Sequence, residues 1–88
     1  MLRLFIAGMT LRSTEAVARV KSLCAEHLQG RFELEIIDIY QQPGLAKEYQ
    51  VLAVPMLVKI SPAPARCLVG DLSDVDKVLR SLDIHIRR

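Results

Sequence analysis

The sequence predicts a single α/β domain, in which a strand–helix–strand unit is followed by a short helix, a β-hairpin and a last helix. With 88 residues, the chain lies below the usual size of about 100–200 residues per domain, so residues 1–88 are expected to form one unit. The residues are 51% hydrophobic but only 5% aromatic, which indicates an aliphatic core. Short apolar runs also alternate with segments of helical periodicity.

The first strand and the first helix have the clearest patterns. Leu2–Ala7 is a nearly continuous apolar run and predicts a buried strand. Apolar residues then recur at helical spacing, which predicts an amphipathic helix over about 14–28. Ser13 or Thr14 is expected to cap this helix, and Glu15 places a negative charge in its first turn.

Residues 32–39 alternate apolar and acidic side chains and then become apolar, which predicts a strand that is more buried towards its end. Because a full helix separates the two strands, they are expected to pair in parallel. Asp38, near the end of the strand, is expected to cap the next turn. Gln42-Pro43-Gly44 then interrupts the chain, and a short helical segment is expected over 45–50.

The segment 51–60 is ambiguous because it is apolar almost throughout but contains Pro55. Proline is disfavoured both inside a helix and in the centre of a sheet, so a strand is expected only after it, over 56–60. A second strand over 66–69 completes an antiparallel hairpin.

The last helix is expected to start at Ser73, as its N-cap, and to end near Asp83. The predicted order βαβαββα is that of a thioredoxin-like fold. The Val54–Pro55 bond then precedes the third strand, where this fold commonly has a cis-proline.

Charge and segment composition exclude several classes of protein. The net charge of +2 is too small for nucleic-acid binding by phosphate neutralisation. No apolar stretch approaches the roughly 20 residues of a membrane span. The N-terminal segment lacks the pattern of a secretory leader, so a reducing cytoplasm is the expected location.

No catalytic or metal-binding constellation is recognisable. A thiol oxidoreductase needs a cysteine at the start of the first helix, where this chain has Met9–Ser13. Cys24 lies on the apolar stripe of the helix and is expected in the core, whereas Cys67 is equally compatible with exposure and burial. His27 and His85 have no metal-ligand spacing. No phosphate-binding loop or other cofactor motif is present, so the residues favour a non-enzymatic binding module without cofactor or metal.

Several motifs in this order resemble the KaiB family of circadian clock proteins. The resemblance spans about residues 2–84, and the N-terminal sensor domain of the histidine kinase SasA is a relative. The motifs are Leu4-Phe5-Ile6-Ala7-Gly8, Ile37-Asp38-Ile39, Leu52-Ala53-Val54-Pro55-Met56-Leu57 and Gly70-Asp71-Leu72-Ser73-Asp74.

The resemblance implies a non-enzymatic adaptor that binds the CI ring of the ATPase KaiC, with KaiA or a SasA-like kinase as further partners. It also implies a metamorphic chain, with an oligomeric ground state (tetramer or dimer) of order βαββααβ and a monomeric thioredoxin-like state. Matching positions place partner binding at Phe5, Ile6 and Lys59. They place the balance between the two folds at Pro55, Ser81 and Asp83.

Five positions depart from the family pattern on or near the partner surfaces. Met9 and Leu11 replace asparagine and proline, and Glu15, Glu35 and Cys67 replace basic residues. These departures suggest a divergent member with a different KaiC-type partner, in a clock or in stress or signalling regulation. A thioredoxin-like thiol oxidoreductase and a stand-alone sensor domain that pairs with a histidine kinase remain as alternatives.

Overall fold

A computed structural model of the chain describes residues 1–27, 32–51, 53–61, 65–70, 72 and 74–82. These residues form four strands and three helices in the predicted order. The elements are β1 (Leu2–Ile6), α1 (Leu11–His27), β2 (Leu34–Asp38), α2 (Pro43–Glu48), β3 (Met56–Lys59), β4 (Arg66–Val69) and α3 (Val75–Ser81).

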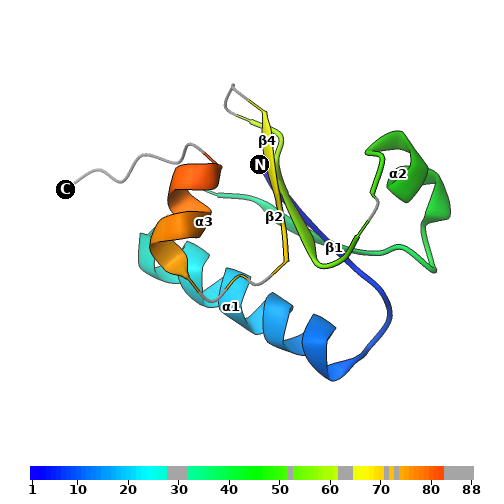
Figure 1. Cartoon of the computed structure of the whole chain (residues 1–88), viewed down its shortest axis with the longest axis horizontal. Helices are drawn as coiled ribbons and strands as arrows, with labels where there is room; N and C mark the ends of the chain where they lie inside the picture. The colour runs from blue at the N-terminus through cyan, green and yellow to red at the C-terminus, as the bar shows by residue number, and fades with distance from the viewer. Residues whose placement is uncertain (28–31, 52, 62–64, 71, 73, 83–88) are drawn as a thin grey trace.

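The strands form one mixed sheet of order β2-β1-β3-β4 (Figure 1). β1 pairs in parallel with β2 and antiparallel with β3, and β3 pairs antiparallel with β4. The parallel pair, the hairpin and a cis bond at Val54–Pro55 are therefore confirmed. β1 is an inner strand, so both of its edges are already paired.

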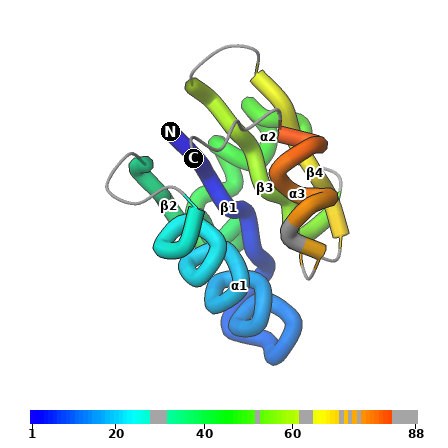
Figure 2. The backbone as a smooth tube through the Cα atoms, turned by 90° about the vertical axis from the view of Figure 1, so that its left-hand side faces the viewer, coloured from blue at the N-terminus to red at the C-terminus, as the bar shows by residue number. Residues whose placement is uncertain are grey.

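Helices cover both faces of the sheet, and each face has its own apolar cluster. α1 and α3 lie together on one face and α2 lies on the other (Figure 2). Because side chains alternate along β1, Leu4 and Ile6 pack under α1 and α3, whereas Phe5 packs on the α2 side. The aliphatic core expected from composition is thus divided by the sheet.

α1 begins at Leu11, three residues before the predicted start, because Thr10 is its cap. The backbone N–H of Ser13 donates to Thr10 Oγ1 at 3.1 Å, which is the usual N-cap bond. The expected caps Ser13 and Thr14 are therefore inside the helix. The expected acidic first turn is also wrong, since the first turn has no acidic residue and Glu15 lies beyond it.

α3 is capped by Asp74, whose carboxylate accepts a hydrogen bond from the N–H of Lys77 at 3.1 Å. The prediction of Ser73 as the cap is wrong by one residue. The helix ends at Ser81, two residues before the position near which its end is predicted. Ser73 and Asp83 lie outside the described residues.

α2 spans Pro43–Glu48, two residues earlier than the predicted 45–50. The tyrosine that follows it, Tyr49, attaches this segment to the sheet. Arg3 Nη1 donates to the Tyr49 hydroxyl at 2.8 Å, and the guanidinium lies 5.3 Å from the ring centroid. The Phe5 and Tyr49 rings are 5.5 Å apart. The second face is therefore covered by a few specific contacts rather than by a long helix.

β2 is an edge strand and is shorter than the predicted 32–39. Ile37 is 2% exposed, but Ile36 remains 37% exposed because it lies at the border of the sheet. The expected increase in burial towards the end of this segment is confirmed, because Asp38 and Ile39 are also partly buried whereas Phe32, Glu33 and Glu35 are exposed.

Candidate functional site

The first turn of α1 occupies the place where a thioredoxin-type enzyme would have its reactive thiols. Here the N-cap and the third helical position are Thr10 and Ser13, and their hydroxyl oxygens lie 3.0 Å apart in a hydrogen bond. Ser13 is 5% exposed. A helix N-terminus lowers the pKa of a thiol far enough for chemistry at neutral pH, but an alcohol has no comparable ionisation. This turn therefore offers a hydroxyl pair and no redox couple.

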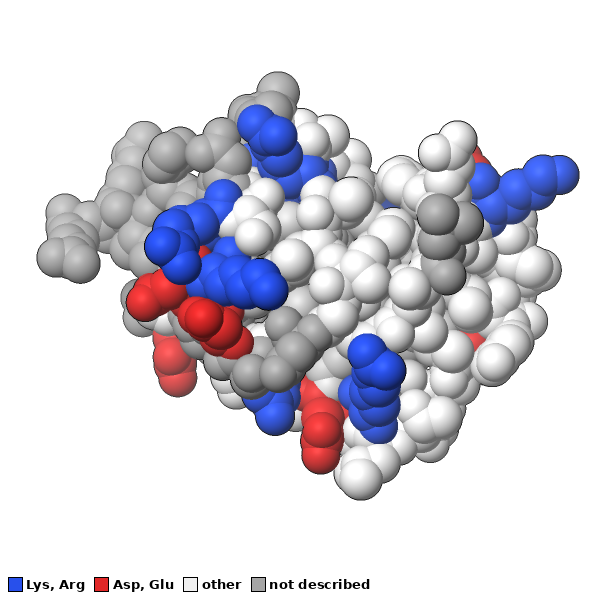
Figure 3. Space-filling view, viewed as in Figure 1, with Lys and Arg blue, Asp and Glu red and all other residues white. Residues whose placement is uncertain are grey.

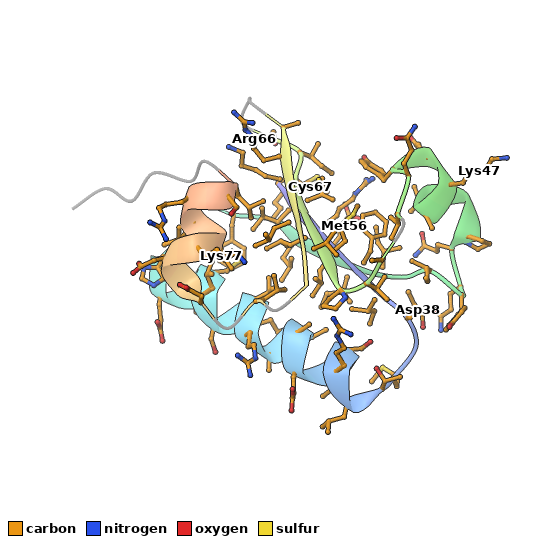
Figure 4. The ribbon with its side chains drawn as sticks, in the orientation of Figure 1. Asp38, Lys47, Met56, Arg66, Cys67 and Lys77 are labelled. Carbon is orange, nitrogen blue, oxygen red and sulfur yellow. The ribbon has the colours of Figure 1, made fainter. Side chains whose placement is uncertain are left out.

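The two cysteines lie elsewhere, and neither has the environment of a redox centre. Cys24 is fully buried beneath the last turn of α1, and burial raises the pKa of its thiol. Cys67 is exposed on β4, far from the first turn of α1 (Figure 4). The expected burial of Cys24 is confirmed, and the open question of Cys67 is settled as exposure.

We expect thiol reagents to distinguish the two cysteines. In the native protein, Ellman's reagent should modify Cys67 at once and Cys24 at least about a hundredfold more slowly, through opening of the fold. Since burial raises the Cys24 pKa, the unfolded chain loses this proton first, and stability should fall as pH rises above the ordinary value of 9.0. A Cys67→Ser variant should retain one thiol, which reacts slowly in the native protein and at once in denaturant. Two fast thiols in the native chain would contradict the packing of α1.

Three large apolar side chains are exposed at the end of the sheet where β1 and β2 lead into their loops. Met9, Leu11 and Tyr40 are 86%, 77% and 75% exposed, and we call them the apolar tip. Asp38 joins the two loops, because its Oδ1 accepts from the N–H of Gly8 at 3.3 Å and from that of Tyr40 at 2.9 Å. The expected turn-capping role of Asp38 is confirmed, and it gives the apolar tip a fixed base.

The residues predicted to bind a partner are buried in this fold. Phe5 is 0%, Ile6 is 4% and Lys59 is 3% exposed, and the first two point to opposite faces of the sheet. In this conformation they support the sheet rather than line a surface. Their role in partner binding stays a prediction, and it requires either an indirect effect or another conformation.

The residues predicted to set the balance between folds are dispersed. Pro55 is buried at the start of β3, and Ser81 is the half-buried last residue of α3. Asp83 lies outside the described residues. The described structure therefore does not bring the three together.

Sequence reasoning missed a cavity of about 320 Å³ beside α1, which we call the arginine cavity. Its lining comes from α1 and from two later segments of the chain, and consists of Arg12, Glu15, Ala16, Arg19, Pro55, Gly70 and Leu72. The available signal was the spacing of Arg12, Glu15 and Arg19, which places all three on one stripe of a helix. Figure 3 shows basic and acidic side chains along α1, beside a broad uncharged area.

The described residues show no cluster of three or more potential metal ligands. Within the same part of the chain, no helix combines the length and the apolar character that a membrane crossing requires.

Comparison with known proteins identifies relatives over nearly the whole chain. The KaiB domain model matches residues 3–84. Over 83 residues the chain is 43% identical to the circadian clock oscillator protein KaiB of Microcystis aeruginosa, covering 94% of this chain and 80% of that protein. It is 41% identical to the circadian clock protein KaiB3 of a Synechocystis strain, covering 94% of this chain and 81% of that protein.

Solved structures confirm the thioredoxin-like fold. The N-terminal domain of Synechococcus elongatus SasA matches with a TM-score of 0.75 and 30% identity, covering 92% of this chain and 76% of that one. The Drosophila thioredoxin Deadhead matches with a TM-score of 0.73 over 92% of this chain and 78% of that one, but its 20% identity supports only the fold. Sequence and structure together show that the chain belongs to the KaiB family of circadian clock proteins.

Proposed function

We propose that the chain is a non-enzymatic adaptor that binds the CI ring of a KaiC-type ATPase and regulates it in the cytoplasm. Family membership supports a clock regulator in general. The assignment of the binding surface rests on the exposure of the positions that differ from the family pattern. The five positions at which the chain departs from the family pattern on or near partner surfaces are all exposed. They are Met9, Leu11, Glu15, Glu35 and Cys67.

The apolar tip is the proposed centre of this contact. A few side chains that become fully buried at the centre of an interface usually supply most of its binding energy, and tyrosine is among the commonest of them. Met9, Leu11 and Tyr40 have most of their surface available, so a partner can bury it without moving the core. Glu15 and Glu35 predict that the facing surface of this partner is not acidic, because like charges across an interface cost several kcal/mol.

We expect Leu11→Asp to weaken ring binding by at least about tenfold, or about 1.4 kcal/mol. The substitution removes an apolar contact, but it should not harm the fold, because an acidic residue in the first turn of α1 favours the helix dipole. Size-exclusion chromatography with light scattering, with the ring and nucleotide, measures the loss. Ala65→Asp is the matched control, because Ala65 is also exposed but lies in the loop before β4.

Wild-type chain that never co-elutes with a KaiC-type ring would contradict the proposal. An equal loss of ring binding in Leu11→Asp and Ala65→Asp would contradict the assignment of the apolar tip as the binding surface. Addition of KaiA or a SasA-like kinase to the same experiment tests the further partners.

We further propose an oligomeric second fold, a tetramer or dimer, with Pro55, Ser81 and Asp83 setting the balance. The same chromatography of the chain alone tests it, because the slow exchange of a monomer with a larger species should give two interconverting peaks. A single monomeric peak at every concentration would contradict it.

The similarity to the SasA domain supports a second candidate, a stand-alone domain that pairs with a histidine kinase. The adaptor is favoured because identity to the KaiB proteins reaches 43%, against 30% to the SasA domain. A pull-down that returns a kinase and no ATPase ring would reverse this order.

A further inference from the structure

The arginine cavity has an apolar floor of fixed shape. Ala16 and Leu72 are each 4% exposed, and Pro55 is buried. Gly70 leaves one side open, since a Cβ built there would meet nothing within 4 Å and its φ of +108° disfavours any larger residue. The volume of about 320 Å³ lies at the low end of ligand sites, which leaves room for one apolar side chain together with the backbone that carries it.

The rim of the cavity is charged and belongs to α1. Arg12, Glu15 and Arg19 are three and four residues apart, so their side chains follow one another along the helix at the mouth of the cavity. Arg19 already takes part in an interaction within the chain, so among the described residues of the rim Arg12 is the positive charge that an occupant would pair with. An occupant with a single carboxylate would complement it, and Glu15 would direct that carboxylate towards an arginine.

Arg12 is poorly placed for the stability of the helix. It is the second residue of α1, where the helix dipole disfavours a positive charge, and no acidic residue of the first turn compensates it. No hydrogen bond or ion pair joins the Arg12 guanidinium to another described residue. A charge that opposes local helix stability without an ion pair to a described residue is a local conflict of the kind found at functional sites, which makes Arg12 a candidate binding residue.

We propose that the arginine cavity binds a partner segment that inserts an apolar side chain and presents an adjacent carboxylate to Arg12. The apolar side chain packs on Ala16, Pro55 and Leu72, and the carboxylate lies at the rim. The inference rests on the proposed function, because the segment is expected on the KaiC-type partner. It assigns a second contact beside the apolar tip, on the same end of the domain.

Titration of the ¹⁵N-labelled chain with a blocked leucyl-glutamate dipeptide tests the cavity without the ring. We expect saturable amide shifts at Ala16, Gly70 and Leu72. Arg12→Gln should lower the affinity for the dipeptide by about fivefold, which is the size of an exposed ion pair. The Tm of this variant should stay equal or rise, because a positive charge is removed from the first turn of the helix. Glu15→Gln should raise the affinity for the dipeptide, because the negative charge of Glu15 repels the carboxylate of the dipeptide. Lys47→Gln removes an equal charge on α2, across the sheet, and should change nothing (Figure 4).

The competing outcomes are distinct. Equal binding of the uncharged leucyl-glutamine dipeptide, or equal weakening by Lys47→Gln, would overturn the proposal. Shifts of the same amides by inorganic phosphate at similar affinity would show a simple anion site and would also overturn it. A ring that binds through Leu11 although the dipeptide does not bind would refute the cavity and leave the proposed function intact.

Discussion

Phe5→Ala is expected to lower the free energy of unfolding by about 3–5 kcal/mol, the usual cost of removing a buried aromatic ring. Phe5 is fully buried on an inner strand, and its ring contacts Tyr49 on the α2 side. A domain of 88 residues has only about 4–13 kcal/mol of stability, so this variant should be close to unfolding. Thermal denaturation should show a Tm at least about 12 °C lower.

Two further variants separate the core role of Phe5 from the predicted role in partner binding. Phe5→Leu keeps most of the volume, and we expect a cost below about 1.5 kcal/mol and unchanged ring binding. Val69→Ala alters a side chain that is 46% exposed on the edge strand and should cost less than about 1 kcal/mol. A stable Phe5→Leu variant that no longer binds the ring would instead place Phe5 in the interface.

Local patterns predicted the elements well, because the hydrophobic period and the turn residues are short-range signals. The strand over 66–69 is confirmed at both ends. The start of α1 was wrong because three neighbouring residues, Thr10, Ser13 and Thr14, all have a capping hydroxyl. Which of them caps the helix depends on the angle at which the chain leaves β1, and the sequence pattern does not contain that angle.

The site was harder to predict because it depends on strand order and on distant parts of the chain. The family resemblance places partner binding at Phe5 and Ile6, but the order β2-β1-β3-β4 encloses both residues on an inner strand. The arginine cavity joins Arg12 to Pro55 and Leu72, which the sequence separates by more than forty residues. The packing of α1 against the face of the sheet beside β3 and β4 brings these residues together.

The hydroxyl pair at the start of α1 leads to a second large effect, in a chain that lacks redox thiols at this position. We expect the double variant Thr10→Cys/Ser13→Cys to form a reversible disulfide, because the two hydroxyl oxygens already lie 3.0 Å apart. The S–S bond of about 2.05 Å then needs only a small approach of the side chains.

The new thiol at the N-cap should also be acidic. The helix N-terminus and the Arg12 guanidinium both favour a thiolate, so its pKa should fall below that of an ordinary thiol. With dithiothreitol as the reductant, the dithiol should pass two electrons to the disulfides of insulin, become a disulfide itself and be regenerated. Insulin reduction should therefore rise well above that of the parent chain.

A Cys67→Ser background removes the other exposed thiol, and the buried Cys24 does not compete. Each single cysteine variant should stay inactive, because one thiol cannot resolve the mixed disulfide with insulin. If the folded double variant keeps two free thiols after oxidation with diamide, the geometry of this turn is not that of a dithiol site. If the disulfide forms and insulin is reduced, the missing thiols alone separate this KaiB-family domain from an oxidoreductase of the same fold.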